Sequence, residues 1–313
     1  MPEQASMREA YGKTLVELGR ENQGIVVLDA DLSASTMTKY FMEEFPQRSF
    51  DVGIAEQNMI GIAAGLAASG KIPFASTFAV FAPGRCFDQI RMSIAQSDLN
   101  VKLVVTHGGL SVGEDGTSHQ AIEDFTLICS LPGFTVIIPA DAIETVAVIE
   151  SIASHQGPCY VRLGRPNLPI VLDDDYKFEM GKAVTLKNGT DATIIAIGIM
   201  VAPALDAAYV LARENINCRV LNMSTLKPID KEAIIHAAEE TGAIVTAEEH
   251  MEHGGLSAAV ARILSENHPT PIEYIAVRDT YASSGKPAEL LERYGLTAND
   301  IIAAVRKAIK RKS

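Results

Sequence analysis

The sequence predicts an α/β fold of two tandem α/β domains, the first built on a doubly wound, mainly parallel sheet and the second smaller. Apolar runs alternate with helical patterns along most of the chain, and the runs are continuous and rich in β-branched residues. A polar stretch at 172–191 interrupts this alternation once, which indicates a domain boundary. The 313 residues are enough for two domains of ordinary size.

The first domain is expected over residues 1–175. Its apolar runs, such as "IVVL", "VKLVV" and "TVII", are typical of parallel strands buried on both faces of a sheet. The helical patterns between them suit the crossover connections that such strands need. The expected strands and helices occupy, in chain order, the segments 24–32, 55–70, 72–82, 84–97, 101–109, 121–133, 134–142, 143–157 and 158–165.

A linker is expected over 176–190, where Asn188 and Gly189 form a turn signal, and the second domain over 191–313. The alternation resumes there and ends in a polar helical tail from about Ala288. Its strands and helices are expected within 192–200, 202–216, 218–224, 231–242, 243–250, 254–267 and 271–277. A polar cluster after one strand is interpreted as a solvated turn; it consists of Glu248, Glu249, His250 and His253.

The composition excludes several classes of partner. A formal net charge of -12 would repel a nucleic-acid backbone, and the basic end "VRKAIKRKS" fits the negative end of a terminal helix instead. No stretch approaches the ~20 apolar residues of a membrane span. The four cysteines are scattered without a CxxC pair, which favours reduced residues in a cytoplasmic protein. We therefore expect no nucleic-acid or membrane partner.

Polar or aromatic residues follow most of the apolar runs, and ligands of open α/β sheets bind beyond the carboxyl ends of the strands. Taken singly, Asp29 and Asp51 are explained as helix caps or Asx-turns, and Glu56 as a first-turn carboxylate. Together, these residues predict an active site at one sheet edge. The set comprises Asp29, Asp31, Ser33, Ser35, Asp51, Glu56, Phe78, Phe81, Thr106, His107, Glu114, Asp115, His119, Arg162 and Arg165.

Other nucleotide and metal sites are not predicted. The glycines of "GLSVGEDG" and "GIAAGLAASG" lack the strand context and later acidic residue of a dinucleotide fingerprint. No phosphate-binding loop with Gly-Lys-Ser/Thr is present, and no His/Asp cluster has the spacing of metal ligands. We therefore expect neither a nicotinamide cofactor nor a metal ligand set from this chain.

Several motifs resemble one known family. The segments "FDVGIAEQNMIGIAAGLAASG", "FASTFAVFA", "THGGLSVGEDGTSHQAIED", "PADAIE" and "LGRPNLP" are together similar to the pyrimidine-binding domain of transketolase, a thiamine-diphosphate enzyme. "VTAEEHMEHGGLSAAVA" resembles the C-terminal domain of that family. The family's diphosphate-binding domain, with its Gly-Asp-Gly motif, has no counterpart before residue 25. The chain thus resembles the C-terminal half of a split transketolase whose other half is a separate polypeptide.

The resemblance implies a cofactor site. A glutamate at the position of Glu56 hydrogen-bonds the aminopyrimidine ring of thiamine in this family and favours the tautomer that removes the proton from the thiazolium carbon. Phe78 and Phe81, in "STFAVF", would pack on the pyrimidine ring. Asp31 and Leu32, in "DADLS", would lie near the cofactor and the subunit contact.

The resemblance also implies a sugar site. His107, Asp115 and His119 would hydrogen-bond the hydroxyls and the carbonyl of a sugar as its carbon–carbon bond breaks, which makes the two histidines catalytic together with Glu56. Arg165 would clamp the terminal phosphate of the sugar through its guanidinium fork. Arg8 and Ser35 would be weaker partners of that phosphate.

The implied reaction is reversible transfer of a two-carbon ketol group from a ketose phosphate to an aldose phosphate. It would need thiamine diphosphate, Mg²⁺ and the diphosphate-binding subunit, which would supply the metal ligands. An α2β2 assembly is expected, because in this family the cofactor lies between domains of different protomers. The chain alone should be inactive.

Three alternatives stay open on the sequence. The β subunit of a 2-oxoacid dehydrogenase first component has the same two domains and an "AEQ" glutamate, but lacks the "THGG" to "GEDGTSH" loop. Deoxyxylulose-phosphate synthase shares "AEQ" and "STF" but does not match at His107. A non-catalytic subunit of the same fold should have drifted at Glu56, His107 and His119, and all three fit the motifs.

Overall fold

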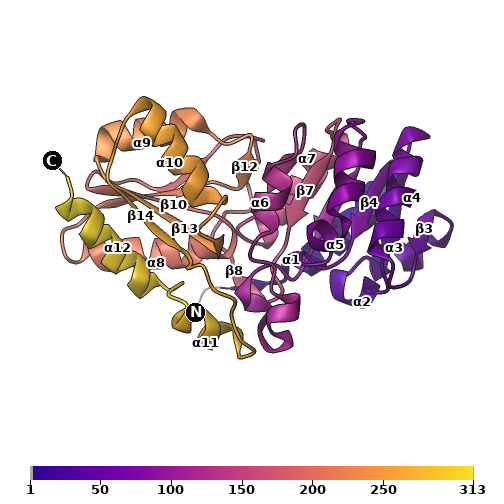
Figure 1. Ribbon diagram of the computed structural model, residues 1–313, viewed down its shortest axis with the longest axis horizontal. Helices are drawn as coiled ribbons and strands as arrows, with labels where there is room; N and C mark the ends of the chain where they lie inside the picture. The colour runs from indigo at the N-terminus through magenta and orange to yellow at the C-terminus, as the bar shows by residue number, and fades with distance from the viewer. Residues whose placement is uncertain (1–2, 313) are drawn as a thin grey trace.

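The computed structural model describes residues 3–312 and shows two α/β domains side by side, each with a central sheet covered by helices (Figure 1). The predicted fold class is confirmed. The first and second domains meet along the middle of the molecule, with α6 (Asp124–Cys129) and β12 (Thr225–Lys227) at the junction.

The sheet of the first domain has the strand order β12-β6-β7-β5-β4-β2-β3, and six of its seven strands are parallel. Continuous apolar runs form these strands because both faces of the sheet are buried. The strands contributed by the first domain are β2 (Ile25–Asp29), β3 (Ser49–Asp51), β4 (Ile72–Ser76), β5 (Lys102–Val105), β6 (Thr135–Ile137) and β7 (Cys159–Arg162).

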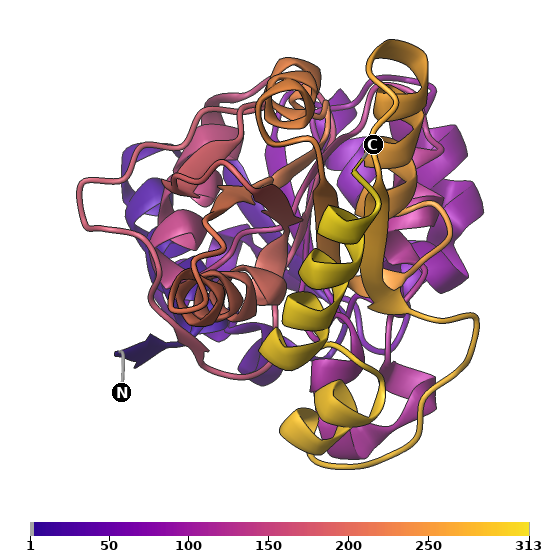
Figure 2. The same ribbon diagram turned by 90° about the vertical axis from the view of Figure 1, so that its left-hand side faces the viewer.

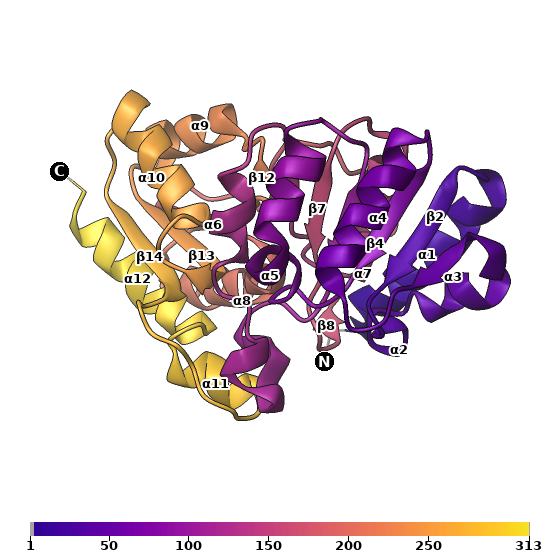
Figure 3. The same cartoon turned by 45° about the vertical axis from the view of Figure 1, so that its right-hand side comes forward.

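Successive residues of these strands enter two different cores, as the alternation of side chains in a strand requires. Val27 and Phe74 pack with α1 (Met7–Glu21) and α7 (Ala142–Ser154). Leu28 and Ala75 pack on the opposite face, which Figure 3 shows covered by α4 (Glu56–Ala68), α5 (Ala82–Gln89) and α6. The sheet is therefore doubly wound, as predicted.

Short helical segments occupy the loops of the first domain. Those that follow β2 and β5 at their carboxyl ends are α2 (Ser33–Thr36) and the 3₁₀ turns η3 (Leu110–Asp115) and η4 (Thr117–His119), while α3 (Lys39–Glu44) and the 3₁₀ turn η1 (Pro46–Arg48) lead back to the start of β3. A π-helical turn, Ile90–Ala95, continues α5. Near the chain start, β1 (Gln4–Ala5) pairs with β8 (Leu168–Pro169).

The second sheet has the order β14-β13-β10-β11-β9 and is parallel except for β9. Its strands are β9 (Val184–Lys187), β10 (Ala192–Ala196), β11 (Cys218–Asn222), β13 (Ile244–Met251) and β14 (Ile272–Val277). Its helices are α8 (Val201–Ala212), α9 (Lys231–Thr241), α10 (Leu256–Asn267), α11 (Pro287–Arg293) and α12 (Ala298–Lys310). Figure 2 shows α12, in yellow, lying along this sheet.

Two features of the boundary differ from the sequence prediction. The segment 176–190, expected to be a linker, contains β9, which pairs with β11 as an edge strand of the second sheet. The chain of the second domain also returns to the first, because β12 pairs antiparallel with β6. The apolar core on the α6 face continues into α9 and α10, so the two domains share buried surface.

Helix boundaries follow local capping chemistry. Asp141 caps α7 and Asp230 caps α9, each through a side-chain oxygen that accepts a backbone N–H of the first turn. Thr297 and Asp300 form a reciprocal capping box at α12, whose last turn carries Lys307 and Lys310 as the basic end predicted. Among residues 3–312, no helix has both the length and the apolarity needed to cross a membrane.

Candidate active site

The carboxyl ends of β2, β4, β5 and β7 lie at one edge of the first sheet, because these four strands are parallel neighbours. The loops that follow them carry nearly all the residues predicted for the site. Thr106 and Phe78 form a parallel bridge just beyond β5 and β4, which brings their two loops together.

Glu56 is the first residue of α4 and only 3% exposed. Its Oε2 accepts a hydrogen bond from Nη1 of Arg85 at 3.0 Å, and the Arg85 guanidinium lies 4.1 Å from the centroid of the Phe81 ring. Glu56 is therefore not an exposed capping carboxylate. Sequence reasoning missed Arg85, although its position one helical turn after Phe81 was a usable signal.

A row of aromatic rings runs from Glu56 towards the histidines. The rings of Phe81 and Phe78 are stacked with centroids 5.8 Å apart, and Phe78 stacks on His107 at 3.9 Å. His119 meets both phenylalanines edge-on, at 5.4 Å from Phe81 and 6.2 Å from Phe78. The structure thus brings together five of the predicted residues in one continuous group, counting Glu56 at its end.

His107 is buried and has a left-handed backbone conformation, with φ of 58°. Its Nδ1 lies 2.8 Å from Oγ1 of Thr106, and the two atoms share a hydrogen bond. Burial, together with the smaller effects of the nearby Arg8, Arg165 and His119, lowers the pKa of His107 to about 3. The imidazole is therefore neutral at physiological pH.

Two arginines lie close to His107, as the charge effects on its pKa indicate. Arg8 donates from Nη1 to the carbonyl of Ser35 at 2.8 Å and from Nη2 to the carbonyl of Arg165 at 3.0 Å. Burial is the main cause that lowers the pKa of Arg8, and the positive charge of Arg165 acts in the same direction. Within residues 3–312 its buried Nε has no hydrogen-bond partner. Two adjacent cations with a spare buried donor suit a divalent anion such as a phosphate group.

Arg165 contacts the loop that carries the histidines. Its Nη1 donates to Oε2 of Glu114 at 3.2 Å and to the carbonyl of Val112. Asp115 ends η3 and is exposed. The structure therefore places Arg8, Ser35 and Arg165 together, next to His107, with Asp115 at the rim.

Asp29, at the end of β2, accepts hydrogen bonds from Leu32 N–H at 2.6 Å and from two threonine hydroxyls. Burial raises the pKa of Asp29 to about 6. Asp51 accepts from the N–H groups of Gly53 and Asp31. Asp51 therefore forms the Asx-turn that the sequence suggested, whereas Asp29 bonds the backbone three residues on and two hydroxyls, and forms neither an Asx-turn nor a helix cap. The left-handed Asp31, with φ of 62°, and Leu32 begin the loop that reaches Arg8 through Ser35.

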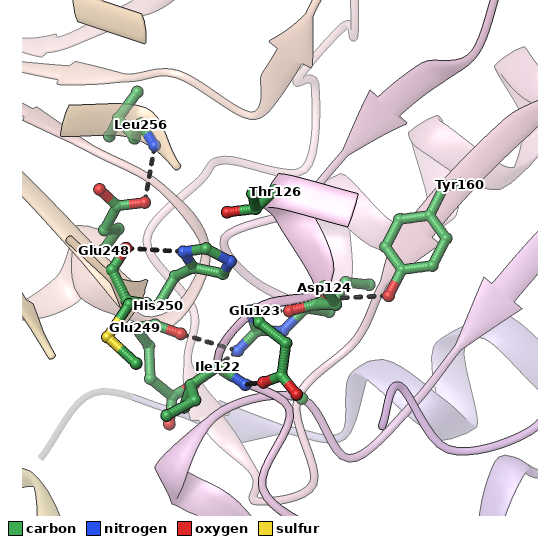
Figure 4. Close-up of polar contacts among 12 residues, drawn as sticks. Ile122, Glu123, Asp124, Thr126, Tyr160, Glu248, Glu249, His250 and Leu256 are labelled. Atoms are coloured by element: carbon green, nitrogen blue, oxygen red, sulfur yellow. Dashed lines mark hydrogen bonds and ion pairs between the residues drawn. The ribbon is translucent and has the colours of Figure 1, made fainter. Parts of the chain in front are cut away.

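The polar cluster of the second domain is not a solvated turn, and that prediction is wrong. Glu248, Glu249 and His250 are at most 5% exposed, and only His253 is exposed. Figure 4 shows the three residues where the domains meet: Glu249 and His250 lie beside Glu123 and Asp124 of the first domain, and Glu248 turns toward Leu256 of its own domain. Glu249 is bonded to Arg162 and Ser111, which are 87 and 138 positions away, and Glu248 is bonded to the start of α10, which is why local sequence suggested exposure.

Arg162 belongs to this junction and not to the sugar site. Its Nη1 donates to Asp124 at 3.2 Å and its Nη2 to Oε2 of Glu249 at 3.3 Å, with all three side chains buried. Burial raises the pKa of Glu249 to about 7 and also raises the pKa of Asp124, although Arg162 opposes both shifts. One cation is thus shared by two buried carboxylates.

The family model "Transketolase, pyrimidine binding domain" matches residues 3–171, and "Transketolase, C-terminal domain" matches residues 181–301. The 6-deoxy-6-sulfo-D-fructose transketolase subunit SqwH of Clostridium sp. (strain MSTE9) is 44% identical, over 98% of this chain and 95% of its own length. Human transketolase is 40% identical over 96% of this chain, which spans 49% of the human protein.

A solved structure of a split gene transketolase, an inactive beta4 tetramer, superposes with a TM-score of 0.93 at 54% identity. The match covers 98% of this chain and 99% of that one. The similarity therefore extends over both domains and both sheets. The chain belongs to the transketolase family of thiamine-diphosphate-dependent transferases and corresponds to the C-terminal section of those enzymes.

Proposed function

We propose that this chain is the C-terminal subunit of a split transketolase that transfers a two-carbon ketol group from a ketose phosphate to an aldose phosphate. The observation that carries the proposal is the continuous row from buried Glu56 through Phe81 and Phe78 to His107, ending beside Arg8 and Arg165. Such a row has a carboxylate at one end, a flat apolar surface in the middle and two neighbouring arginines at the other.

The residues present fit the pyrimidine end of thiamine diphosphate. Glu56 is buried beside the Phe81 ring, and Arg85 engages only its Oε2 in hydrogen bonds within the described chain, which leaves Oε1 for a ligand nitrogen. Phe78 and Phe81 offer stacked aromatic surface for a planar ring. When bound, thiamine diphosphate supplies a nucleophilic carbon. In this proposal Glu56 binds the pyrimidine ring and holds a proton between its carboxyl and a ring nitrogen.

The charges and protonation states of the residues at the other end of the row support binding of a sugar phosphate. A neutral His107 can donate a hydrogen bond to a sugar hydroxyl or carbonyl, or accept one from a hydroxyl, and it adds no charge beside the arginine pair. His119, half-buried against both phenylalanines, faces the same group from the η4 turn, and Asp115 would reach a hydroxyl from the rim. Arg8 and Arg165 would bind the terminal phosphate in place of Glu114 and the backbone carbonyls that they now contact.

The missing half is proposed to be a separate diphosphate-binding subunit that also supplies the Mg²⁺ ligands, in an α2β2 assembly. Human transketolase is about twice as long as the region matched here, and a beta4 tetramer of a split gene transketolase is inactive. Both facts support a chain that needs a partner. Asp31 and Leu32 would lie near the cofactor and that subunit contact. A cytoplasmic location remains a prediction from the scattered cysteines.

The 2-oxoacid dehydrogenase and deoxyxylulose-phosphate synthase alternatives are not favoured, because transketolases match across both domains. The preferred sugars are left to experiment, since relatives are named for sugars as different as 6-deoxy-6-sulfo-D-fructose and apulose 4-phosphate.

The test is an assay of ketol transfer from xylulose 5-phosphate to ribose 5-phosphate with thiamine diphosphate and Mg²⁺. The chain is assayed alone, its candidate partner alone, and then the two mixed. We expect transfer only in the mixture. The proposal would be contradicted if the mixture showed no transfer with this donor or with a panel of other ketose donors, although the partner was shown to bind the cofactor.

A further inference from the structure

The loop that carries the predicted sugar ligands is held from the second domain. This loop, residues 107–119, begins at the end of β5 and runs through η3 and η4. Near its start, Ser111 N–H donates to Oε1 of Glu249 at 2.5 Å. Glu249 lies in β13 of the other domain and is 138 positions away in sequence.

The same carboxylate completes a buried ion pair under the loop. Oε2 of Glu249 accepts from Arg162, which also donates to the Glu249 carbonyl at 3.0 Å and to Asp124. A Cβ at Gly108 would collide with the Arg162 side chain, and a Cβ at Gly109 with the Glu249 carboxylate. The two glycines after His107 therefore let the loop lie directly on this pair.

The far end of the loop is attached to the second domain as well. Thr117 Oγ1 donates to the Ala282 carbonyl at 2.5 Å, and Gln120 Nε2 donates to the Ser283 carbonyl at 3.1 Å. Ser284 Oγ donates to the Glu114 carbonyl at 2.5 Å. His107 and His119 thus stand at the two ends of a loop whose course depends on contacts with residues 249 and 282–284.

We propose that Glu249 is a positioning residue for the sugar site: from the second domain, it fixes the loop that sets His107 and His119 relative to one another. This inference rests on the proposed function for its effect on sugars, and on geometry alone for its effect on the loop. It gives the C-terminal domain a part in substrate binding although none of its residues is expected to touch the sugar.

The carboxylate cannot be replaced by an amide without loss. Glu249 accepts from Ser111 with one oxygen and from Arg162 with the other. In Glu249→Gln, whichever way the amide turns, its NH₂ group faces one of these two donors. One buried hydrogen bond is lost and two donors face each other, while the volume of the side chain is preserved.

Glu248 provides a matched control. It is the neighbouring residue of the same strand and just as buried, and burial raises its pKa to about 7 as well. Its oxygens accept from the N–H groups of Leu256 and Ser257 at the start of α10, inside its own domain (Figure 4). Glu248→Gln therefore makes the same chemical change and weakens the second domain without touching the loop.

The first experiment measures backbone amide exchange in the full chain for the wild type, Glu249→Gln and Glu248→Gln. We expect the peptide containing Ser111 to exchange about 10-fold faster or more in Glu249→Gln, the effect of losing a hydrogen bond to a charged group. In Glu248→Gln the same peptide should keep the wild-type rate. Wild-type exchange in Glu249→Gln would overturn the proposal, whatever the activity of the enzyme.

The second experiment measures ketol transfer by the complexes of these variants with the partner subunit. For Glu249→Gln we expect the KM for sugar phosphate to rise about 10-fold or more, with half-saturation by thiamine diphosphate unchanged. Glu248→Gln should keep the wild-type KM. A faster-exchanging loop with an unchanged sugar KM would overturn the positioning role. Absence of transfer in the wild-type complex would refute the proposed function, and the exchange experiment would still decide whether Glu249 holds the loop.

If Glu249→Gln does not fold, Thr117→Val provides the test, because it removes the hydroxyl that donates to Ala282 at the other end of the loop and keeps the side-chain shape. We expect faster exchange around residue 117 and a higher sugar KM. Wild-type values of both would overturn the inference that the second domain fixes this loop.

Discussion

The ring of Phe78 stacks on the imidazole of His107 with centroids 3.9 Å apart and an angle of 24° between the planes. This contact joins the aromatic surface beside Glu56 to the residue at the start of the loop that is proposed to bind the sugar. The position of His107 is therefore coupled to the surface on which the pyrimidine ring would pack.

Phe78→Leu should impair both halves of the site. The substitution keeps a buried apolar side chain but removes the stacking on His107 and Phe81. We expect weaker binding of thiamine diphosphate and a higher KM for sugar phosphates in the same variant. Phe87→Leu, in α5 and outside the aromatic row, is the control and should leave both constants unchanged. An effect on the cofactor alone would show that the stack does not position His107.

The low pKa of His107 predicts a pH-dependent loss of stability. The folded state keeps the imidazole neutral down to about pH 3, whereas the unfolded chain protonates near the usual value of 6.5. As the pH falls below 6.5 the unfolded state binds more protons, so the free energy of unfolding decreases.

The comparison is with His107→Asn, which cannot titrate in this range. Between about pH 8 and pH 5, the wild type should lose about 2 kcal/mol more than the variant in denaturant unfolding. If the two proteins lost the same free energy of unfolding over this pH range, His107 would be protonated at pH 5 in the folded state as it is in the unfolded chain.

The arginine pair predicts selectivity for phosphorylated sugars. Arg165→Met removes a guanidinium that is part-buried next to Arg8, and loss of a charge-assisted contact should lower kcat/KM for a sugar phosphate about 10- to 100-fold. The same complex should use a ketose without phosphate at the wild-type rate. Arg306→Met removes an exposed arginine that pairs with Glu214 in the second domain, and should change neither rate. Equal losses with both sugars would argue against a phosphate-binding role.

The pairing of β12 with β6 predicts that the first domain is incomplete alone. A fragment of residues 1–175 lacks β12 and would expose the edge of β6 together with the apolar surface under α9 and α10. We expect this fragment to aggregate or to bind a hydrophobic dye, and to recover when residues 176–313 are added. A monodisperse fragment that melts at the temperature of the full chain would contradict the shared core.

Much of the fold was readable from the sequence because it depends on local patterns. The β-branched runs predicted β2, β5 and β6, and the polar or aromatic residues that follow β2, β4 and β5 converge at one sheet edge as parallel topology requires. The specific pairing of Phe78 with His107 could not be read in this way, since two loops meet there only after the sheet has formed.

The errors have a common cause in long-range contacts. Glu248, Glu249 and His250 have the polarity of a surface turn, but Glu249 is buried against Arg162 and His250 against Phe125 of the other domain. Glu248 is buried against the start of α10. Likewise β12 and β9 are short strands whose partners lie far along the chain or across a polar stretch. No local pattern distinguishes a polar residue that will be buried with a partner from one that will stay in water.

The role of Glu56 in ketol transfer is tested most directly by assaying the complex of Glu56→Gln with the partner subunit beside the wild-type complex. Gln keeps the shape of the side chain and removes the carboxyl that would hold a proton against the pyrimidine ring. We expect kcat to fall about 100-fold or more while the two subunits still assemble. Full transfer by the Glu56→Gln complex would contradict this role.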